Sequence, residues 1–294
     1  MKRTAFTMIE LIFVIVIMGI IGKFGTEFLA QAYESFIFSS TNNKLQARSA
    51  KTVEFIASRL QYRIKDSVIA RTGAANAPVG IGSVVATTNY TVLEWVSTDI
   101  DGFRGATKPY WSSILDLDAS NATNLVSPDT NTTAINALIQ TLSNGGSNLS
   151  NAAIYFIGSN NDINAYGYVG GLGNQNGSIH PINADAGTLA LDDFTSSIGG
   201  VDFTGVDLYE YYKLVWTANA IIWSAANGGT LTYYYDYQPW NNKQIGNANT
   251  KSEIIMEGVT TFQFMAIGSI IKIQVCAGDD LVEDYSLCKE KTVF

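Results

Sequence analysis

The sequence predicts an α+β protein in which one long N-terminal helix packs on a mostly antiparallel β head. The first observation is an apolar N-terminal run, followed by a stretch from Thr26 to Thr72 that contains neither Gly nor Pro and so offers no helix-breaking residue. The second is a change after Gly73 to short β-branched and aromatic runs that Gly, Asn and Ser separate. The third is a hydrophobic content of 47% in 294 residues, which is ample for a packed core.

The helix is expected to run from Phe6 to Ala70, which is about 98 Å at about 1.5 Å per residue. Its second half is amphipathic, because apolar residues recur every three or four positions. These positions are Val53, Ile56, Leu60, Ile64 and Val68, and we expect them to dock on the head. The chain is then expected to divide into a leader (1–5), a transmembrane segment (6–29), an amphipathic helical segment (30–72) and a β-rich head (73–294).

The head is expected to be built from short antiparallel strands. The predicted strands are Thr91–Val96, Ala153–Ile157, Tyr211–Trp216, Ala220–Ser224 and Leu231–Tyr237. Asn227-Gly228-Gly229 predicts a hairpin turn between the last two. A second hairpin is expected where Ile254–Ile267 turns at Gly268-Ser269 into Ile270–Cys276. A short helix around Ala134–Leu142 and long exposed loops at 143–151 and 158–178 complete the expectation.

Charge is distributed unevenly along the chain. Residues 1–71 hold 10 Lys and Arg against 5 Asp and Glu, whereas residues 72–294 hold 8 against 21, so the net charges are +5 and −13. A head of charge −13 repels phosphate backbones, so we expect no general nucleic-acid binding there. The basic residues of 44–71 favour a solvated helix face over contact with a membrane surface or a nucleic acid.

The N-terminal segment raises a question about one carboxylate. Lys2 and Arg3 precede the apolar run Leu11–Gly22, which predicts a cytoplasmic N-terminus and an exported remainder. A secretory signal peptide would carry a small-residue cleavage site after that run, and none is present. A plain membrane anchor gives no reason for Glu10, since an ionised side chain in hydrocarbon costs about 2.5–3.5 kcal/mol or more.

The stretch Ala5-Phe6-Thr7-Met8-Ile9-Glu10-Leu11-Ile12 resembles the class III signal of type IV prepilins and type II secretion pseudopilins. The resemblance implies that a prepilin peptidase cuts between Ala5 and Phe6 and methylates the new amine of Phe6. It also implies that Glu10 acts in subunit assembly, where the amine of a neighbouring Phe6 neutralises it. Two positions depart from the family pattern: Ala5 stands where Gly is usual, and Met8 where Leu is usual.

The same resemblance implies a non-enzymatic subunit of a type II secretion pseudopilus or type IV pilus, which serves protein secretion or DNA uptake. It implies contact with other pilins or pseudopilins through the N-terminal helix, and an inner-membrane location with the head in the periplasm. The large head is typical of a minor subunit with a priming or tip role. The Val259–Phe264 strand, the hairpin after it and the closing Cys-Lys-Glu-Lys segment resemble J-type minor pseudopilins or related minor pilins.

The only cysteines are Cys276 and Cys288, which have 11 residues between them. In an exported chain they form a natural disulfide pair, with a stabilisation of about 3 kcal/mol. Two reduced thiols in a cytosolic protein are the alternative, which the export signal disfavours.

Sites for other chemistry are sparse. His180, the only histidine, lies in a turn-like stretch and is interpreted as a surface residue. Four carboxylates, Asp279, Asp280, Glu283 and Asp284, have the oxygen ligands for Ca²⁺, yet a solvated acidic loop is the favoured interpretation and no cofactor is expected.

Two further patterns are weaker. The sequon at Asn131 follows an acidic residue, which hints at bacterial glycosylation. The aromatic residues Trp95, Trp111, Trp216, Trp223, Tyr233–Tyr235 and Trp240 would form a carbohydrate platform in the alternative function, a membrane-anchored periplasmic binding module or adhesin. Core packing is the favoured interpretation.

Overall fold

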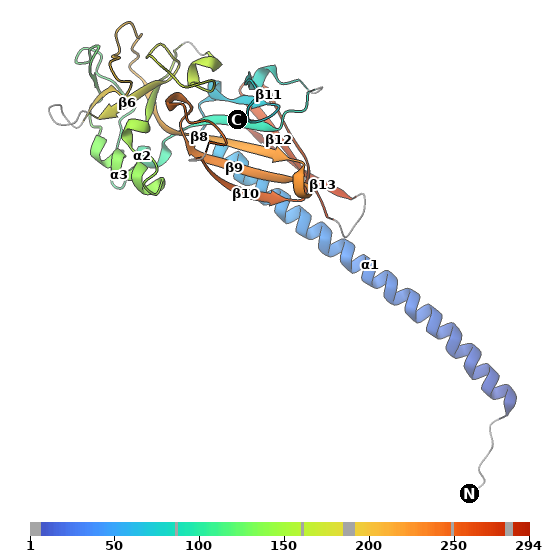
Figure 1. The fold of residues 1–294 in the computed structure, drawn as a ribbon. Helices are drawn as coiled ribbons and strands as arrows, with labels where there is room; N and C mark the ends of the chain where they lie inside the picture. Colours follow the sequence, from blue (N-terminus) through green and yellow to red (C-terminus); the bar gives the residue numbers. More distant parts are fainter. Residues whose placement is uncertain (1–6, 86–87, 160–161, 185–191, 248–249, 280–284) are drawn as a thin grey trace.

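The computed structural model describes residues 7–85, 88–159, 162–184, 192–247, 250–279 and 285–294. It confirms the α+β class, because a 53-residue helix, α1 (Met8–Leu60), packs by its C-terminal part on an antiparallel β head. The rest of α1 projects away from the head as a rod, and its first residue, Met8, lies at the end remote from the head (Figure 1).

The large sheet of the head is antiparallel and centres on the 13-residue strand β8 (Tyr212–Ser224). One path of neighbours runs β2-β1-β3-β8-β5-β6-β7-β4, while β9 pairs with β8 and β10 pairs with β9. The other strands are β1 (Ile69–Arg71), β2 (Val79–Gly80), β3 (Val92–Thr98), β4 (Leu125–Val126), β5 (Ala153–Phe156), β6 (His180–Ala184), β7 (Asp193–Ser196), β9 (Thr230–Tyr237) and β10 (Lys251–Glu257).

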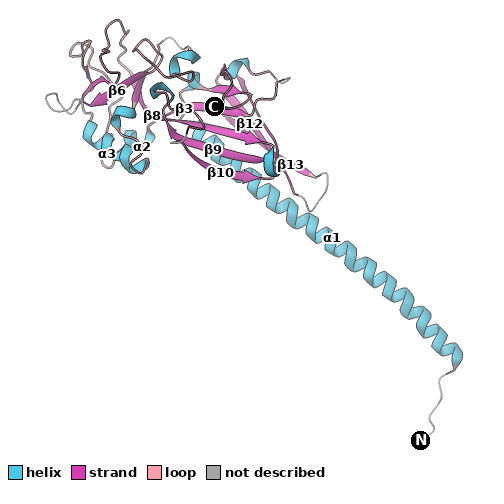
Figure 2. Cartoon of the chain, viewed as in Figure 1, coloured by secondary structure: helices cyan, strands magenta, loops and turns pink. Residues whose placement is uncertain are grey.

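A smaller sheet has the order β11 (Val259–Ile267), β12 (Ile270–Gly278) and β13 (Ser286–Val293). Figure 2 shows the strands of the head lying beside the C-terminal part of α1, with α2 (Ile100–Arg104) and α3 (Thr132–Leu142) in a lobe at the end remote from the rod. The predicted helix around Ala134–Leu142 is confirmed as α3, whose first turn is capped by Asn131.

The buried stripe of α1 begins only near its last five turns. Leu45, Val53, Ile56 and Leu60 are buried, and they share one hydrophobic cluster with Phe262 and other inward-facing side chains of the small sheet. The predicted docking of the stripe is therefore confirmed for Val53, Ile56 and Leu60. Ile64 and Val68 are also buried, although they do not belong to the helix.

The expectation that the helix continues to Ala70 is wrong, because α1 ends at Leu60. The next residues leave the helical path and pair with the end of β3: Ile64 N–H donates to Val96 O at 2.9 Å, and Thr98 N–H donates to Tyr62 O at 2.9 Å. The helical spacing of apolar residues continues past Leu60, but the backbone there forms hydrogen bonds with β3 instead of extending the helix. Ile64 and Val68 are therefore buried in the core from a segment that is not helical.

Two strand predictions also change in detail. The runs predicted as Tyr211–Trp216 and Ala220–Ser224 form one continuous strand, β8, which turns through Asn227-Gly228-Gly229 into β9 as predicted. The run Ile254–Ile267 is divided at Gly258, whose φ is 74°, into β10 and β11, which belong to different sheets. A left-handed φ suits Gly, which has no Cβ to clash. The hairpin at Gly268-Ser269 is confirmed.

The loops 143–151 and 158–178 are irregular as expected, but they are not simply exposed. Ser143, Ser147 and Leu149 are buried in the first, and Tyr166 and Tyr168 lie in a core cluster in the second.

The Arg63 guanidinium forms hydrogen bonds with three separate parts of the chain. Its Nη1 donates to Leu60 O at the end of α1 (2.8 Å) and to Phe294 O at the C-terminus (3.4 Å). Its Nη2 donates to Ser269 O in the β11–β12 turn (2.7 Å). Because Arg63 is buried, these carbonyls satisfy a charge that would otherwise be costly to enclose.

Cys276 and Cys288 form a disulfide, as the sequence predicts. They are directly opposite each other in the β12–β13 pair, and 12 positions separate them. The bond therefore ties the C-terminal strand β13 to the strand that precedes it.

We expect the double variant Cys276→Ser/Cys288→Ser to lose about 2–3 kcal/mol of unfolding free energy, because a closed loop of this size restricts the unfolded chain. The measurement is urea unfolding of the full-length protein in detergent. The matched control is the wild type after reduction, which should fall to the stability of the double variant. Equal stability of the oxidised wild type and the double variant would contradict the prediction.

Candidate functional site

The N-terminal half of α1 is a helix surface that the head leaves uncovered. From Met8 to Ser40 every residue is exposed except Ile37, which is partly buried. The helix is long and apolar enough over this stretch to cross a membrane, near the N-terminus of the chain. The first side chain with an aromatic contact to the head is Phe38, whose ring lies 5.2 Å from that of Tyr285.

This uncovered surface is longer than a membrane span. The 33 residues from Met8 to Ser40 rise about 50 Å, whereas hydrocarbon is about 30 Å thick and takes up about 20 residues. Beyond the expected transmembrane segment (6–29), the helix still carries large apolar side chains in exposed positions: Tyr33 (66%), Phe36 (69%) and Phe38 (47%). Exposed apolar surface of this extent marks an interaction site.

Glu10 lies in the first turn of α1, where its backbone N–H donates to Thr7 O at 3.1 Å. It is the only charged residue between Thr7 and Gly22. Among the described residues, no basic group forms an ion pair with the Glu10 carboxylate. The next cation along the helix is Lys23, and its amine lies 3.9 Å from the carboxylate of Glu27. The carboxylate is thus placed in an apolar helix surface without a partner from the described part of its own chain.

The structure gives a mixed result for the other predicted sites. Ala5 and Phe6 lie outside the described residues, as do Asp280, Glu283 and Asp284. Asp279 is described, and its carboxylate is 3.6 Å from the Lys44 amine. Among the residues that the structure describes, no three His, Cys, Asp or Glu side chains form a group that could hold a metal ion.

Asn131 and the aromatic residues have structural roles. The Asn131 side-chain oxygen accepts from Ala134 N–H at 2.9 Å and caps α3. Trp95, Trp111, Tyr233 and Trp240 are buried in the core, which confirms the packing interpretation for these residues, whereas Trp216, Trp223, Tyr234 and Tyr235 are half-buried. Two indole N–H groups donate to backbone carbonyls, that of Trp223 to Val259 O and that of Trp240 to Asn151 O.

The interpretation of His180 as a surface residue is wrong. His180 lies at the start of β6 with 4% of its surface exposed, and its ring is 4.9 Å from that of Phe156. Burial lowers the pKa of His180 to about 4, although a hydrogen bond with the backbone of Gln175 opposes the shift. The neighbouring Pro181 suggests a turn in sequence, but both residues pair with β5.

A buried ion pair is the polar feature that the sequence does not reveal. Arg71 Nε is 3.0 Å from Glu94 Oε2, and Tyr237 donates to the other carboxylate oxygen at 3.0 Å. Arg71 also donates to Asn76 O and Tyr168 O. Burial raises the pKa of Glu94 to about 7, against the lowering effects of Arg71 and Tyr237. The one available signal is a lone carboxylate inside the apolar run Thr91–Val96.

The Arg71–Glu94 pair is enclosed, so its chemistry is structural. Both side chains are almost fully buried, at 6% and 0% exposure, and their hydrogen bonds go to the surrounding backbone and to tyrosine. Removing one partner would leave an uncompensated buried charge, which is why such pairs are costly to break.

No protein-family model, curated protein or solved structure matches the chain. The uncovered half of α1, with Glu10 near its start, is the feature of the molecule that most directly indicates a function. It presents exposed apolar surface and, within the run from Met8 to Gly22, one carboxylate for which the described residues offer no ion-pair partner.

The lowered pKa of His180 predicts a specific acid sensitivity. The unfolded chain takes up a proton below about pH 6.5, whereas the folded protein does so only near pH 4. Stability from neutral His180 is therefore present above pH 6.5 and is lost as the pH falls through this window, by about 3 kcal/mol. Burial raises the pKa of Glu94 to about 7 and that of Asp99 to about 6, so these two groups act in the opposite sense.

The test compares the wild type with His180→Gln by urea unfolding of the full-length protein in detergent from pH 7 to pH 4. Glu94 and Asp99 are common to both proteins, so their contributions cancel in the difference. We expect the wild type to lose stability relative to the variant as the pH falls. A difference that does not change with pH would contradict the prediction.

Proposed function

We propose that this protein is a non-enzymatic subunit of a type II secretion pseudopilus or a type IV pilus, assembled through the N-terminal half of α1. The observation that carries the proposal is Glu10, a carboxylate without an ion-pair partner among the described residues, in an apolar helix surface that the head leaves uncovered. The string Phe6-Thr7-Met8-Ile9-Glu10-Leu11 at this position resembles the processing signal of that family.

The proposed assembly contact combines one ion pair with the burial of exposed apolar side chains. Cleavage between Ala5 and Phe6 creates an α-amine, which is methylated and pairs with Glu10 of a neighbouring subunit. A pair of opposite charges in lipid is tolerated where a lone charge is not. The exposed aromatic residues Tyr33 and Phe36, which follow the transmembrane segment, are then covered by neighbouring helices above the membrane.

The proposed location follows from the charges at the ends of the apolar run. Lys2 and Arg3 stay in the cytoplasm, α1 crosses the inner membrane, and the acidic head with its disulfide lies in the periplasm before assembly. The size of the head favours a minor subunit with a priming or tip role. The finer assignment to a J-type minor pseudopilin or a related minor pilin is part of the same proposal.

Processing is the first outcome to check. We expect mature chains to begin at Phe6 and to carry one added methyl group on its amine. Intact-mass measurement and N-terminal sequencing of protein extracted from membranes test this. A mature chain that begins near residue 26 would show cleavage by an ordinary signal peptidase and would contradict the proposal.

The second outcome concerns Glu10 itself. Glu10→Leu removes the partner of the neighbouring Phe6 amine, and breaking a buried charge pair costs about 3–5 kcal/mol, a factor of hundreds in assembly. We expect the variant to be cleaved and inserted normally but to fail to crosslink with partner subunits in cells. A plain membrane anchor or binding module would insert as well or better with Leu at this position, and its contacts would not change.

The matched control is Glu27→Leu, which removes another carboxylate of the same uncovered helix that already has Lys23 as its partner. Crosslinking of this variant should be close to that of the wild type. Undiminished crosslinking of a correctly processed Glu10→Leu protein would contradict the pairing role.

A further inference from the structure

A groove of about 490 Å³ lies between the C-terminal part of α1 and the strand β10. Arg48, Lys51, Thr52 and Phe55 line it from the helix, and their spacing of three or four positions places them on one side of α1. Residues 254–257 line it from β10. Since β10 pairs only with β9, the groove lies at an outer strand of the large sheet.

Part of the groove lining is apolar and open to solvent. Ile254 has 59% of its surface exposed, and Ile255 and Phe55, which line the same groove, are half-buried. Met256, the next residue of β10, is buried in the core cluster that also contains the stripe of α1. The groove thus offers exposed apolar surface on a base that the core holds in place, which suits one apolar side chain of a partner.

The helix side of the groove is basic. Residues 44–59 hold four basic residues against one carboxylate, which is already paired with Lys291. Among the residues that the structure describes, Arg48 and Lys51 have no ion-pair partner, although Glu257 lines the same groove. Two available cations beside exposed apolar surface fit a partner that carries carboxylates next to an apolar side chain.

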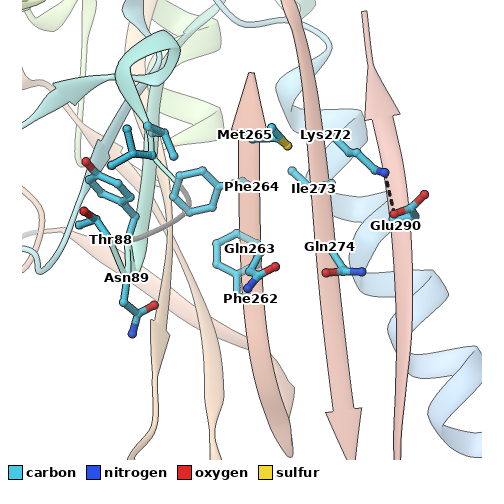
Figure 3. Close-up of a pocket in the computed structure, with 13 residues that line it drawn as sticks. Thr88, Asn89, Phe262, Gln263, Phe264, Met265, Lys272, Ile273, Gln274 and Glu290 are labelled. Carbon is cyan, nitrogen blue, oxygen red and sulfur yellow. Dashed lines mark ion pairs between the residues drawn. The ribbon is translucent and has the colours of Figure 1, made fainter. Parts of the chain in front are cut away.

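A second groove, beside β11, differs in charge. The charged residues of its lining are Lys272 and Glu290, and these pair with each other at 2.9 Å (Figure 3). Charge complementarity therefore indicates no particular partner for the groove beside β11, whereas the groove at β10 has two cations available for carboxylates.

Acidic surface occurs at the other end of the same head. Residues 99–211, which include the lobe with α2 and α3, hold 12 Asp and Glu against 2 Lys and Arg, a net charge of −10. Figure 1 shows this lobe at the end remote from the rod, whereas β10 lies beside α1. The head is therefore acidic at its far end and has basic helix surface where it meets the rod.

One turn of the lobe presents an apolar residue between two carboxylates. It reads Asp116-Leu117-Asp118, and all three residues are exposed, Leu117 at 44%. The turn is held in place, because Asp116 pairs with Val126 of β4 and its Oδ1 accepts from the N–H groups of Asp118 at 3.1 Å and Ala119 at 3.0 Å. Within the described residues the Asp118 carboxylate has no hydrogen bond or ion pair, so Leu117 and Asp118 are available for a contact.

We propose that this turn of one copy of the chain docks in the groove between α1 and β10 of a second copy. Leu117 packs on Ile254, and the carboxylates beside it pair with Arg48 and Lys51. Because the two surfaces differ, the contact is head-to-tail and repeats into an open row of copies instead of closing as a two-fold dimer. It lies outside the uncovered half of α1 and so is separate from the assembly proposed above, and a fibre with two or more adjacent copies satisfies both contacts.

Disulfide trapping tests the contact in full-length protein in detergent. Both native cysteines are already paired, so an introduced cysteine is the only free thiol. Leu117→Cys and Ile254→Cys proteins with different tags are mixed under mild oxidation by diamide, and we expect a mixed dimer because the contact places these positions together. The matched control uses Leu142→Cys, another leucine of the lobe with similar exposure (45%), and should give about tenfold less mixed dimer.

A charge exchange tests the ion pairs. Lys51→Asp in the Ile254→Cys protein should lower the yield of mixed dimer about tenfold, because attraction to Asp118 becomes repulsion, and Asp118→Lys in the partner should restore it. The matched control is Lys65→Asp, which changes an exposed lysine outside the groove and should leave the yield unchanged. Added salt should also lower the yield, because exposed ion pairs are screened. Near-ultraviolet circular dichroism checks that each variant is folded.

Several outcomes would overturn the proposal. They are no mixed dimer, equal yields with Leu117→Cys and Leu142→Cys, a yield that Lys51→Asp leaves unchanged, and as much homodimer of the Leu117→Cys protein as mixed dimer, which would indicate a symmetric contact. The same pair of cysteine variants on a Glu10→Leu background separates this contact from the assembly proposed for α1. We expect the mixed dimer to persist there, and its loss would overturn a direct contact between groove and turn.

Discussion

The buried guanidinium of Arg63 is the interaction on which the arrangement of the head depends. It binds the last turn of α1, the β11–β12 turn and the C-terminal residue, three segments that are distant in sequence. With these held together, the apolar side of the small sheet lies against the buried stripe of α1. Residues 62–64 can then pair with β3, which joins the helix to the large sheet. Arg63 thus links the end of the helix to the small sheet, and the apolar cluster packs the helix against both sheets.

The sequence predicts the parts of this fold that local chemistry determines. The long helix, the Asn227-Gly228-Gly229 turn, the hairpin at Gly268-Ser269 and the disulfide all follow from periodicity, turn residues and cysteine count. Prediction from the sequence fails where pairing with a strand distant in sequence competes with local helix preference. At Leu60 the helix ends because the next residues pair with β3, although the apolar spacing of the helix continues. The burial of His180 could not be predicted either, because the pairing of β6 with β5 that encloses it is a long-range contact.

The candidate site divides in the same way. Glu10 is conspicuous in sequence because a charge in an apolar run is costly, and this needs no tertiary information. The structure adds that the head covers none of the apolar stretch and that large aromatic residues stay exposed beyond the length of a membrane span. That β11 is an outer strand could not be predicted from the sequence, because whether a strand is central or outer depends on the topology of the whole sheet.

The long strand β8 has a mechanical consequence. Its N-terminal part pairs with β5 and its C-terminal part lies between β3 and β9, so β8 connects the lobe that holds α2 and α3 with the strands beside α1. In Figure 1 the strands β9 and β10 are inclined to α1 but lie closer to its axis than to the perpendicular. Interstrand hydrogen bonds are perpendicular to the strands. A pulling force applied along the helix therefore shears many of these bonds together instead of opening them one at a time, so the head resists tension best along the axis of its own rod.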